Sequence, residues 1–171
     1  MAPRKTSYFG IGVEYGLHCL VNLIGLPEGK AIKVRDLAEF QQISESYLAK
    51  TFTRLEQAGI VQSIPGPKGG YRLAKVPEEI TFLEVAEAIE GKTPVFICHD
   101  IRESCVLFGD ETPAYAKRGK CEIHQVMMEA ELQMKNFLSE KTLAWLAETV
   151  GEKLPKRALQ QGADWFTERI R

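Results

Sequence analysis

The sequence has no long hydrophobic run, few cysteines and no excess of charge of either sign. Polar and charged residues interrupt its apolar stretches, so none reaches the roughly 18 to 20 residues that a membrane span needs. The basic N-terminus is not followed by a short apolar core with a small-residue cleavage site, so no secretory signal is expected. We therefore expect a soluble, cytoplasmic protein whose 171 residues bury one core and carry one additional helical element.

Charge is balanced over the whole chain but not along it. The 22 basic and 23 acidic residues nearly cancel, which by itself argues against a nucleic-acid partner. Residues 1–75, however, hold ten Lys or Arg against six Asp or Glu, and the remainder is acidic by five. Any contact with DNA is therefore expected in the first half of the chain.

Four cysteines in a cytoplasmic chain favour metal or redox chemistry over structural disulfides. Cys98, Cys105 and Cys121 fall in one segment, at intervals too long for a zinc knuckle. Soft thiolates on a flexible segment suit an iron-sulfur cluster, which usually takes four protein ligands. At least one further ligand must then come from elsewhere. Cys19 lies in an apolar helix and is expected to pack in the core.

The spacing of apolar residues predicts a mainly α-helical fold with one small β-hairpin. Ser44 is the expected N-cap of the third helix, and Gly59 is expected to end it. Thr81 is the expected N-cap of the fourth, with Glu84 as its capping-box partner. The expected elements are helices over 8–26, 34–40 and 44–58, an extended stretch over 31–33, strands over 60–64 and 71–74, a helix over 81–89, an irregular stretch over 91–121, helices over 122–138 and 142–150, and one more amphipathic helix after 151.

Helix, turn, helix and a glycine-rich hairpin together predict a winged helix-turn-helix that binds DNA. The helix that begins at Ser44 can enter the major groove, whose width of about 12 Å admits a helix. The hairpin loop lets the backbone approach a sugar-phosphate strand closely. A winged helix can also serve protein contacts. The candidate DNA-contacting residues are Ser44, Ser46, Tyr47, Lys50 and Arg54 in the helix, and Lys68, Gly69, Gly70 and Arg72 in the hairpin.

Glu14 and His18 are a candidate ligand pair, because residues four apart share one face of a helix. Both interrupt an otherwise apolar helix. Taken alone, a partly buried histidine and a solvated glutamate are the commoner explanations. His99 and His124 flank the cysteines and are further possible ligands, with a surface histidine again the commoner explanation for each.

Several runs, taken together, resemble the Rrf-two family of iron-sulfur winged-helix regulators over roughly residues 7–150. The combination is specific, whereas no single run would be. The runs are Val13-Glu-Tyr-Gly-Leu-His-Cys19, Ser44-Glu-Ser-Tyr-Leu-Ala-Lys50, Gly69-Gly-Tyr-Arg-Leu73 and Ile80-Thr-Phe-Leu-Glu-Val85, with a cysteine loop in the expected place. The resemblance implies a homodimer joined through the long helix after the loop, a roughly palindromic operator, and a cluster near the dimer contact.

The resemblance also implies a ligand set. In several members the loop cysteines come from one subunit and a first-helix residue from the other. The sequence is most similar to the redox-sensing branch with a [2Fe-2S] cluster, and Glu14, His18, Cys98 and Cys121 match that branch. Cys105 does not match it. The competing assignment is therefore a [4Fe-4S] cluster on all three loop cysteines, with Glu14 or a histidine such as His124 as the fourth ligand.

We expect a redox-sensing repressor or activator whose operator affinity changes with the redox state or presence of the cluster. A cluster-free regulator that uses thiols or zinc, and an electron-transfer or cluster-assembly protein on a winged-helix scaffold, are the alternatives. No nucleophile with a base at a recognisable spacing occurs, so an enzyme is not expected. The expected parts are a DNA-binding domain (1–90), a cluster-binding loop (91–121), dimerisation helices (122–150) and a tail of unassigned role (151–171).

Overall fold

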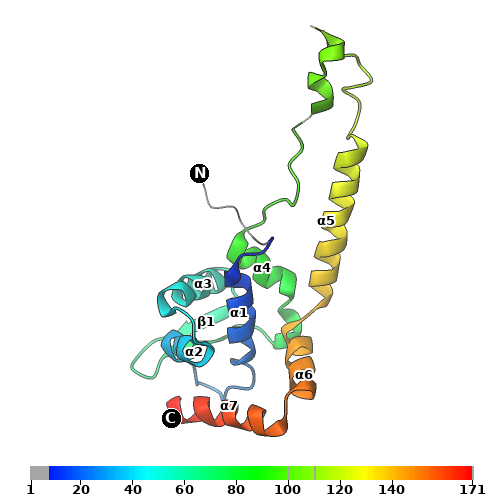
Figure 1. The fold of residues 1–171 in the computed structure, drawn as a ribbon. Helices are drawn as coiled ribbons and strands as arrows, with labels where there is room; N and C mark the ends of the chain where they lie inside the picture. The colour runs from blue at the N-terminus through cyan, green and yellow to red at the C-terminus, as the bar shows by residue number, and fades with distance from the viewer. Residues whose placement is uncertain (1–7, 100, 110, 171) are drawn as a thin grey trace. The chain divides into compact units, whose positions relative to one another are not determined.

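Helices and one β-hairpin follow each other in the predicted order, which confirms the mainly α-helical fold class with a hairpin wing (Figure 1). The computed structural model describes residues 8–99, 101–109 and 111–170, so the first seven residues of the expected DNA-binding domain lie outside the described residues. The elements are α1 (Ile11–Val21), α2 (Val34–Gln41), α3 (Glu45–Gln57), β1 (Val61–Ile64), β2 (Gly70–Leu73), the 3-10 turn η1 (Pro77–Glu79), α4 (Phe82–Glu90), the 3-10 turns η2 (Ile101–Ser104) and η3 (Val106–Phe108), α5 (Glu122–Glu140), α6 (Leu143–Lys153) and α7 (Lys156–Arg169).

The described parts of the chain form two compact units. One comes from Met1–Lys92 and Leu138–Arg171 and contains the winged helix-turn-helix, α6 and α7. The other, Thr93–Phe137, contains the cysteine segment and most of α5. The cysteine segment therefore belongs to a different unit from the DNA-binding elements.

The first helix is shorter than predicted. α1 covers Ile11–Val21 instead of residues 8–26, and hydrogen bonds of the 3-10 type follow it, such as that from Leu23 N–H to the Leu20 carbonyl at 3.0 Å. The Asn22 side chain donates to the His18 carbonyl at 2.8 Å and so occupies an acceptor that another turn of α-helix would use. The apolar pattern beyond residue 21 therefore packs as a turn.

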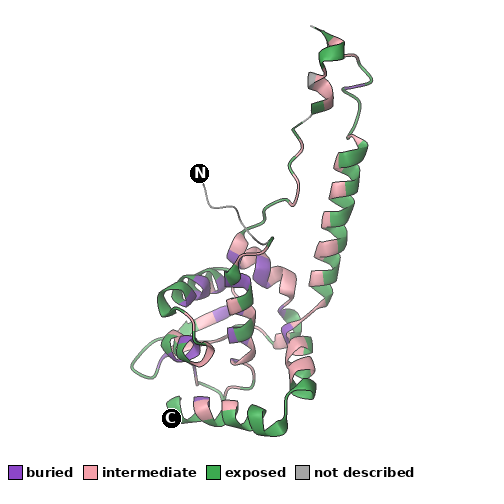
Figure 2. Cartoon of the chain, in the orientation of Figure 1, coloured by how far each residue is buried: buried purple, intermediate pink, exposed green. Residues whose placement is uncertain are grey.

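The core lies where α1, α3 and α4 meet. Leu20, Leu48, Phe52 and Val85 are fully buried there, and Figure 2 shows buried positions on all three helices. Each helix contributes one apolar stripe, so burial of these stripes holds the three helices together. Cys19 is also fully buried, which confirms its predicted place in the core.

Two predicted helix starts are confirmed, and one detail is corrected. Ser44 Oγ accepts the Tyr47 N–H at 3.4 Å, and Thr81 Oγ1 accepts the Glu84 N–H at 3.1 Å. The Glu84 carboxylate, however, forms an ion pair with Lys75. A cationic partner in reach competes with the backbone N–H that a capping box would use, so the reciprocal half of the box was predicted wrongly.

The hairpin wing gains a third, single-residue edge from the segment before α2. β1 and β2 pair antiparallel, with Gln62 opposite Arg72, and Ile32 exchanges two backbone hydrogen bonds with Tyr71. Tyr71 also packs edge-on against Phe52 of α3, with ring centroids 5.1 Å apart. The wing is therefore attached through this aromatic contact to α3, the predicted recognition helix.

The tail forms the additional amphipathic helix that its apolar pattern predicts. In α7, Trp165 and Phe166 pack against Phe40 of α2, with ring centroids 5.1 and 4.7 Å apart. Arg169 lies 3.5 Å from the Trp165 ring centre and 3.3 Å from the Glu39 carboxylate. These contacts dock α7 on α2, the first helix of the helix-turn-helix.

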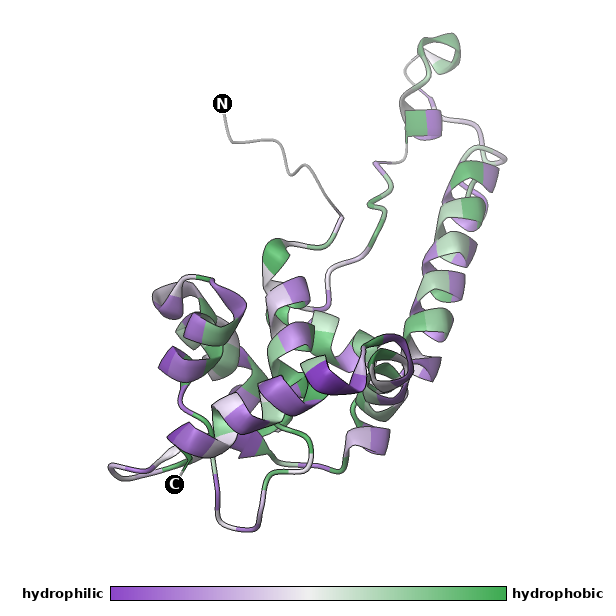
Figure 3. Cartoon of the chain, turned by 60° about the horizontal axis from the view of Figure 1, so that its bottom comes forward, coloured by the Kyte–Doolittle hydropathy of each residue, from purple (hydrophilic) through white to green (hydrophobic). Residues whose placement is uncertain are grey.

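Helix α5 contributes no buried residue, although it is 19 residues long. Ile123, Val126 and Phe137 remain 69%, 64% and 59% exposed. Figure 3 shows hydrophobic and hydrophilic residues alternating along this helix. No helix among the described residues is long and apolar enough to cross a membrane.

Replacing Phe166 with alanine should lower the free energy of unfolding by about 3 kcal/mol, because it removes a buried ring from the contact between α7 and Phe40. Urea denaturation followed by circular dichroism measures the change. The exposed Gln161→Ala change on the same helix is the control and should shift stability by less than about 0.5 kcal/mol. Equal stabilities for the two variants would show that α7 is not docked.

Candidate DNA interface and metal-ligand residues

The N-terminal part of α3 presents most of the predicted DNA-contacting side chains to solvent. Ser44, Ser46, Tyr47 and Lys50 are exposed. Ser44 Oγ and Ser46 Oγ lie 3.0 Å apart, so the two hydroxyls already form a hydrogen-bonded pair. This part of α3 therefore offers hydroxyls, a phenol and a cation, which can bond phosphates and base edges.

Tyr47 also contacts the first helix. Its ring packs edge-on against Tyr15 of α1 with centroids 5.8 Å apart, and its side chain remains 41% exposed. The sequence of α3 alone does not reveal this contact, because Tyr15 lies more than thirty positions earlier in the chain. The start of the recognition helix is thus positioned by α1.

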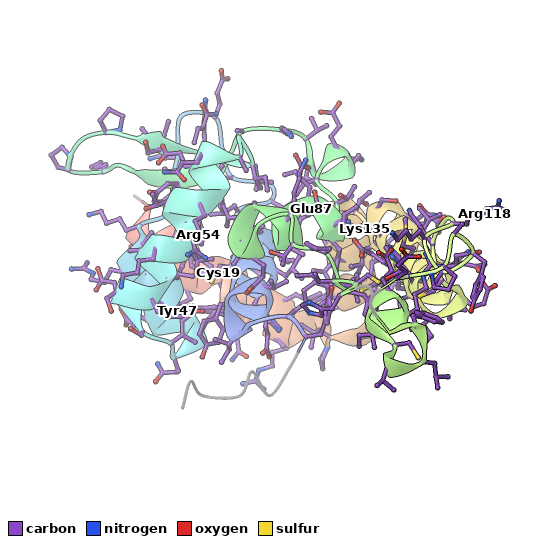
Figure 4. All side chains as sticks on the ribbon, turned by 90° about the horizontal axis from the view of Figure 1, so that it is seen from above. Cys19, Tyr47, Arg54, Glu87, Arg118 and Lys135 are labelled. Atoms are coloured by element: carbon purple, nitrogen blue, oxygen red, sulfur yellow. The ribbon has the colours of Figure 1, made fainter. Side chains whose placement is uncertain are left out.

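Arg54 points away from the other candidates, toward α4 (Figure 4). Its Nη1 donates to the backbone carbonyl of Ile89 at 2.5 Å. A carbonyl in the last turn of a helix has no partner within that helix, so this arginine satisfies one of them. Sequence reasoning had no signal for the contact, because any residue type supplies a backbone carbonyl.

The predicted residues of the wing have different roles in the structure. Lys68 is exposed in the loop between the strands, whereas Arg72 donates two hydrogen bonds to the Gln62 side chain opposite it, in the amide orientation that suits both groups. Gly69 and Gly70 are required by the backbone itself. A Cβ at Gly69 would lie 2.1 Å from the Ile64 carbonyl oxygen, and one at Gly70 would lie 2.4 Å from backbone atoms of Ile32.

Glu14 and His18 lie on one exposed face of α1, as their spacing predicts. Both line a cavity of about 1610 Å³ whose other walls come from the turn after α1, from α6 and from α7. The lining is mainly apolar and includes Leu17, Leu146 and Phe166. Two side chains able to bind a metal therefore stand in a predominantly apolar hollow.

Cys19 is excluded as a ligand by its environment. Its side chain is fully buried, and burial raises the pKa of the thiol to about 12. Thiolate is the form that binds metals and reacts with electrophiles. Cys19 therefore remains a neutral thiol in the core at any physiological pH.

Cys98, Cys105 and Cys121 are partly exposed and form no disulfide in the described part of the unit formed by residues 93–137. The segment that bears them is held at both ends. Near its start, Glu131 of α5 accepts the Val95 N–H at 2.9 Å. Near its end, Arg102 donates to the backbone carbonyls of Arg118, at 3.1 Å, and of Gly119.

Glu131 is the anchor of this arrangement on α5. Lys135 pairs with it at 2.7 Å, and the hydrogen bonds from Lys135 and from the Val95 backbone lower the pKa of the Glu131 carboxyl. Figure 4 shows Lys135 and Arg118 in this unit. The ring of His124, a possible alternative ligand, packs edge-on against Phe96 with centroids 6.1 Å apart.

The donor chemistry of these residues fits an iron-sulfur cluster. Three accessible thiols, an imidazole and a carboxylate are the ligand types that such clusters take. Glu14 and His18 belong to one unit and the three thiols to the other. Among the described residues, no three His, Cys, Asp or Glu side chains gather around a position for a metal ion.

Residues 10–149 match the family Rrf2, described as iron-dependent transcriptional regulators. The chain belongs to this family. It is 28% identical over 160 residues to the HTH-type transcriptional regulator YwgB of Bacillus subtilis (strain 168), which covers 94% of this chain and 95% of that protein. It is 31% identical over 137 residues to the HTH-type regulator YffB of Lactococcus lactis subsp. lactis (strain IL1403), with 80% and 85% covered.

Solved structures of the Rrf2 type share the fold. The structure of CymR (YrzC), the global cysteine regulator of B. subtilis, is similar with a TM-score of 0.62 at 26% identity, over 84% of this chain and 98% of that chain. T. potens IscR is similar with a TM-score of 0.65 at 20% identity, over 88% of this chain and 94% of that chain. The predicted family is confirmed: the chain is a DNA-binding transcription regulator of the Rrf2 family, and its relatives are regulators, not enzymes.

In metal-free protein, Cys98, Cys105 and Cys121 should react with a thiol-specific reagent at pH 8, and Cys19 only after unfolding. Burial keeps the Cys19 thiol protonated and inaccessible. Thiol titration with and without denaturant, with peptide mapping by mass spectrometry, measures the difference. Rapid modification of Cys19 in the folded protein would contradict its place in the core.

Proposed function

We propose that this chain is a homodimeric transcription regulator whose affinity for a palindromic operator changes with the redox state or presence of an iron-sulfur cluster. Glu14 and His18 of one protomer and Cys98 and Cys121 of the other would hold the cluster, with [2Fe-2S] favoured over [4Fe-4S]. The pair of Glu14 and His18 in the apolar hollow beside α1 carries the proposal. The imidazole and the carboxylate lie one helical turn apart on the same face of α1, so one ligand in the hollow can reach both.

The cysteine segment supplies the thiolates of the proposed site. Cys98 follows closely on Val95, which Glu131 fixes to α5, and Cys121 directly precedes α5. Both thiols are therefore tied to the same helix, one at its start and the other about ten residues along it. When bound, a cluster supplies a one-electron redox change, and its potential depends on ligand type and on exposure.

A second copy of the chain accounts for the exposed face of α5. An isolated amphipathic helix is marginal in water, and most helical stability in proteins comes from packing of its apolar face. Ile123, Val126, Ala130 and Phe137 recur at steps of three, four and seven residues, which is the spacing of a helix-helix seam. Pairing of α5 with α5 would bury this stripe, and Rrf2 regulators are typically dimeric.

A dimer also explains the form of the DNA target. Two copies of α3 related by a two-fold axis would bind half-sites about 34 Å apart, one turn of DNA. Small rotations between the protomers then change the fit of both recognition helices at once. We place the protein in the cytoplasm, where its DNA target lies.

A cluster-free thiol regulator is the second candidate. Cys98, Cys105 and Cys121 are partly exposed and form no disulfide among the described residues, which suits thiol oxidation as well as cluster binding. The structural relative CymR is described as a cysteine regulator. Cys105 separates the two candidates, because it has no place in the four-ligand [2Fe-2S] site.

Protein purified without oxygen should contain about two iron and two sulfide per protomer and show a reversible [2Fe-2S] signature by absorption and electron paramagnetic resonance before and after dithionite. Cys98→Ser and Cys121→Ser should lose it, because each removes a ligand, whereas the matched controls Cys105→Ser and Cys19→Ser should keep it. A [4Fe-4S] signature that disappears in Cys105→Ser would move Cys105 into the site. Iron-free protein with thiol-dependent DNA binding would favour the second candidate.

Mixing two defective variants tests whether the site spans the dimer. His18→Ala and Cys98→Ser protomers should each fail to form the cluster alone. In a heterodimer of the two, one of the two sites combines His18 from one protomer with Cys98 from the other and is intact. Differently tagged, co-expressed and tandem-purified heterodimers should therefore recover about half of the wild-type iron and absorbance. No recovery would show that the ligands come from a single protomer.

A further inference from the structure

The C-terminal end of α4 joins three parts of the protein. Arg54 of α3 donates to the Ile89 carbonyl at 2.5 Å, and the Gly10 N–H, just before α1, donates to the Glu90 carboxylate at 3.1 Å. Three residues after Glu90, at Thr93, the unit with the cysteine segment begins. The recognition helix and the segment just before the first helix therefore bond two consecutive residues of α4, and the chain enters the unit with the cysteine segment three residues later.

The first helix is in direct contact with the same residue. A Cβ at Gly12 would lie 3.1 Å from the Ile89 side chain, and one at Gly16 would lie 2.8 Å from it, so a larger residue at Gly16 would require Ile89 to shift. Ile89 is 3% exposed. Because packed interiors are dense and transmit strain, a shift of α1 at this contact would also displace the end of α4, and the reverse.

Through Arg54, the position of Ile89 also constrains α3. Its guanidinium bonds a carbonyl of the last turn of α4, where the partial negative charge of the helix dipole adds to the interaction. Arg54 lies four residues after Lys50, which is exposed near the predicted DNA-contacting start of α3. A displacement of Ile89 would therefore also move Arg54 and, with it, the recognition helix α3.

We infer that Arg54 is a positioning residue that couples the cysteine segment and α1 to the recognition helix, and that it does not act as a phosphate contact. This inference rests on the proposed function, because it takes the cysteine segment and the pair Glu14 and His18 as the sensor. It gives Arg54 a different role from Lys50, although both are cations on α3. The two roles predict different responses to salt and to the loading of the cluster.

The test compares Arg54→Met and Arg54→Lys with Lys50→Met, on an operator duplex selected from a random-sequence library by the wild-type protein. Full-length protein is used with the cluster loaded and after its removal, between about 50 and 200 mM salt. Two quantities are measured by fluorescence anisotropy. One is the slope of log affinity against log salt, and the other is the ratio of affinities in the loaded and cluster-free states.

Loss of a phosphate contact lowers the magnitude of the salt slope by about one, and this is the result expected for Lys50→Met. Arg54→Met should leave the salt slope unchanged and bring the affinity ratio about tenfold closer to one, which is the size of effect expected from loss of a charge-assisted hydrogen bond. If the wild-type ratio is itself less than tenfold, the ratio should fall to one. Arg54→Lys should recover part of the ratio, because an ammonium group can also donate to the Ile89 carbonyl.

A salt slope that falls by about one in Arg54→Met, or a ratio that stays at the wild-type value while affinity drops, would overturn the inference and leave the proposed function intact. A wild-type ratio of one would show instead that the proposed switching has failed, and the coupling role with it. Circular dichroism and urea denaturation of each variant identify unfolding. If Arg54→Met does not fold, the ratio of Arg54→Lys decides alone: a reduced ratio supports the inference, and the wild-type ratio overturns it.

Discussion

The close approach of α1 to the end of α4 is the constraint on which the rest of the structure depends. Gly12 and Gly16 place the backbone of α1 against the Ile89 side chain, which would have to shift to admit a Cβ at Gly16. With that face of α1 fixed, Glu14 and His18 two residues further on must lie on the opposite face, because successive helical residues turn by about 100°. One helix therefore forms a wall of the core and also presents the candidate ligands.

The DNA-binding elements are connected to the same point by different kinds of contact. The Tyr15 ring packs on Tyr47, and Arg54 bonds the Ile89 carbonyl, so α3 is held near both of its ends. The wing is attached to α3 through the rings of Phe52 and Tyr71. Short-range packing and one directional hydrogen bond thus orient the predicted DNA-contacting surface relative to α1 and α4.

Helices α5 and α7 extend this core in opposite ways. The rings of Phe40, Trp165 and Phe166 bury part of α7 against α2, and this helix lies beyond the residues 10–149 that match the family. α5 has the apolar residues of a packed helix, but none of its residues is buried. Burial of such a helix needs a partner, which is the physical reason for proposing a dimer contact there.

The sequence by itself determined the family, the order of helices and hairpin, the caps at Ser44 and Thr81, and the shared face of Glu14 and His18, because these depend on local spacing and local hydrogen bonds. The tertiary structure decided what depends on residues far apart in the chain. It paired Arg54 with a backbone carbonyl and Glu84 with Lys75, ended α1 at Val21, and enclosed the hollow beside α1 with α6 and α7. Every residue type has the same backbone carbonyl, and an apolar pattern does not say which distant segment it packs against. Only the folded chain therefore shows these partners.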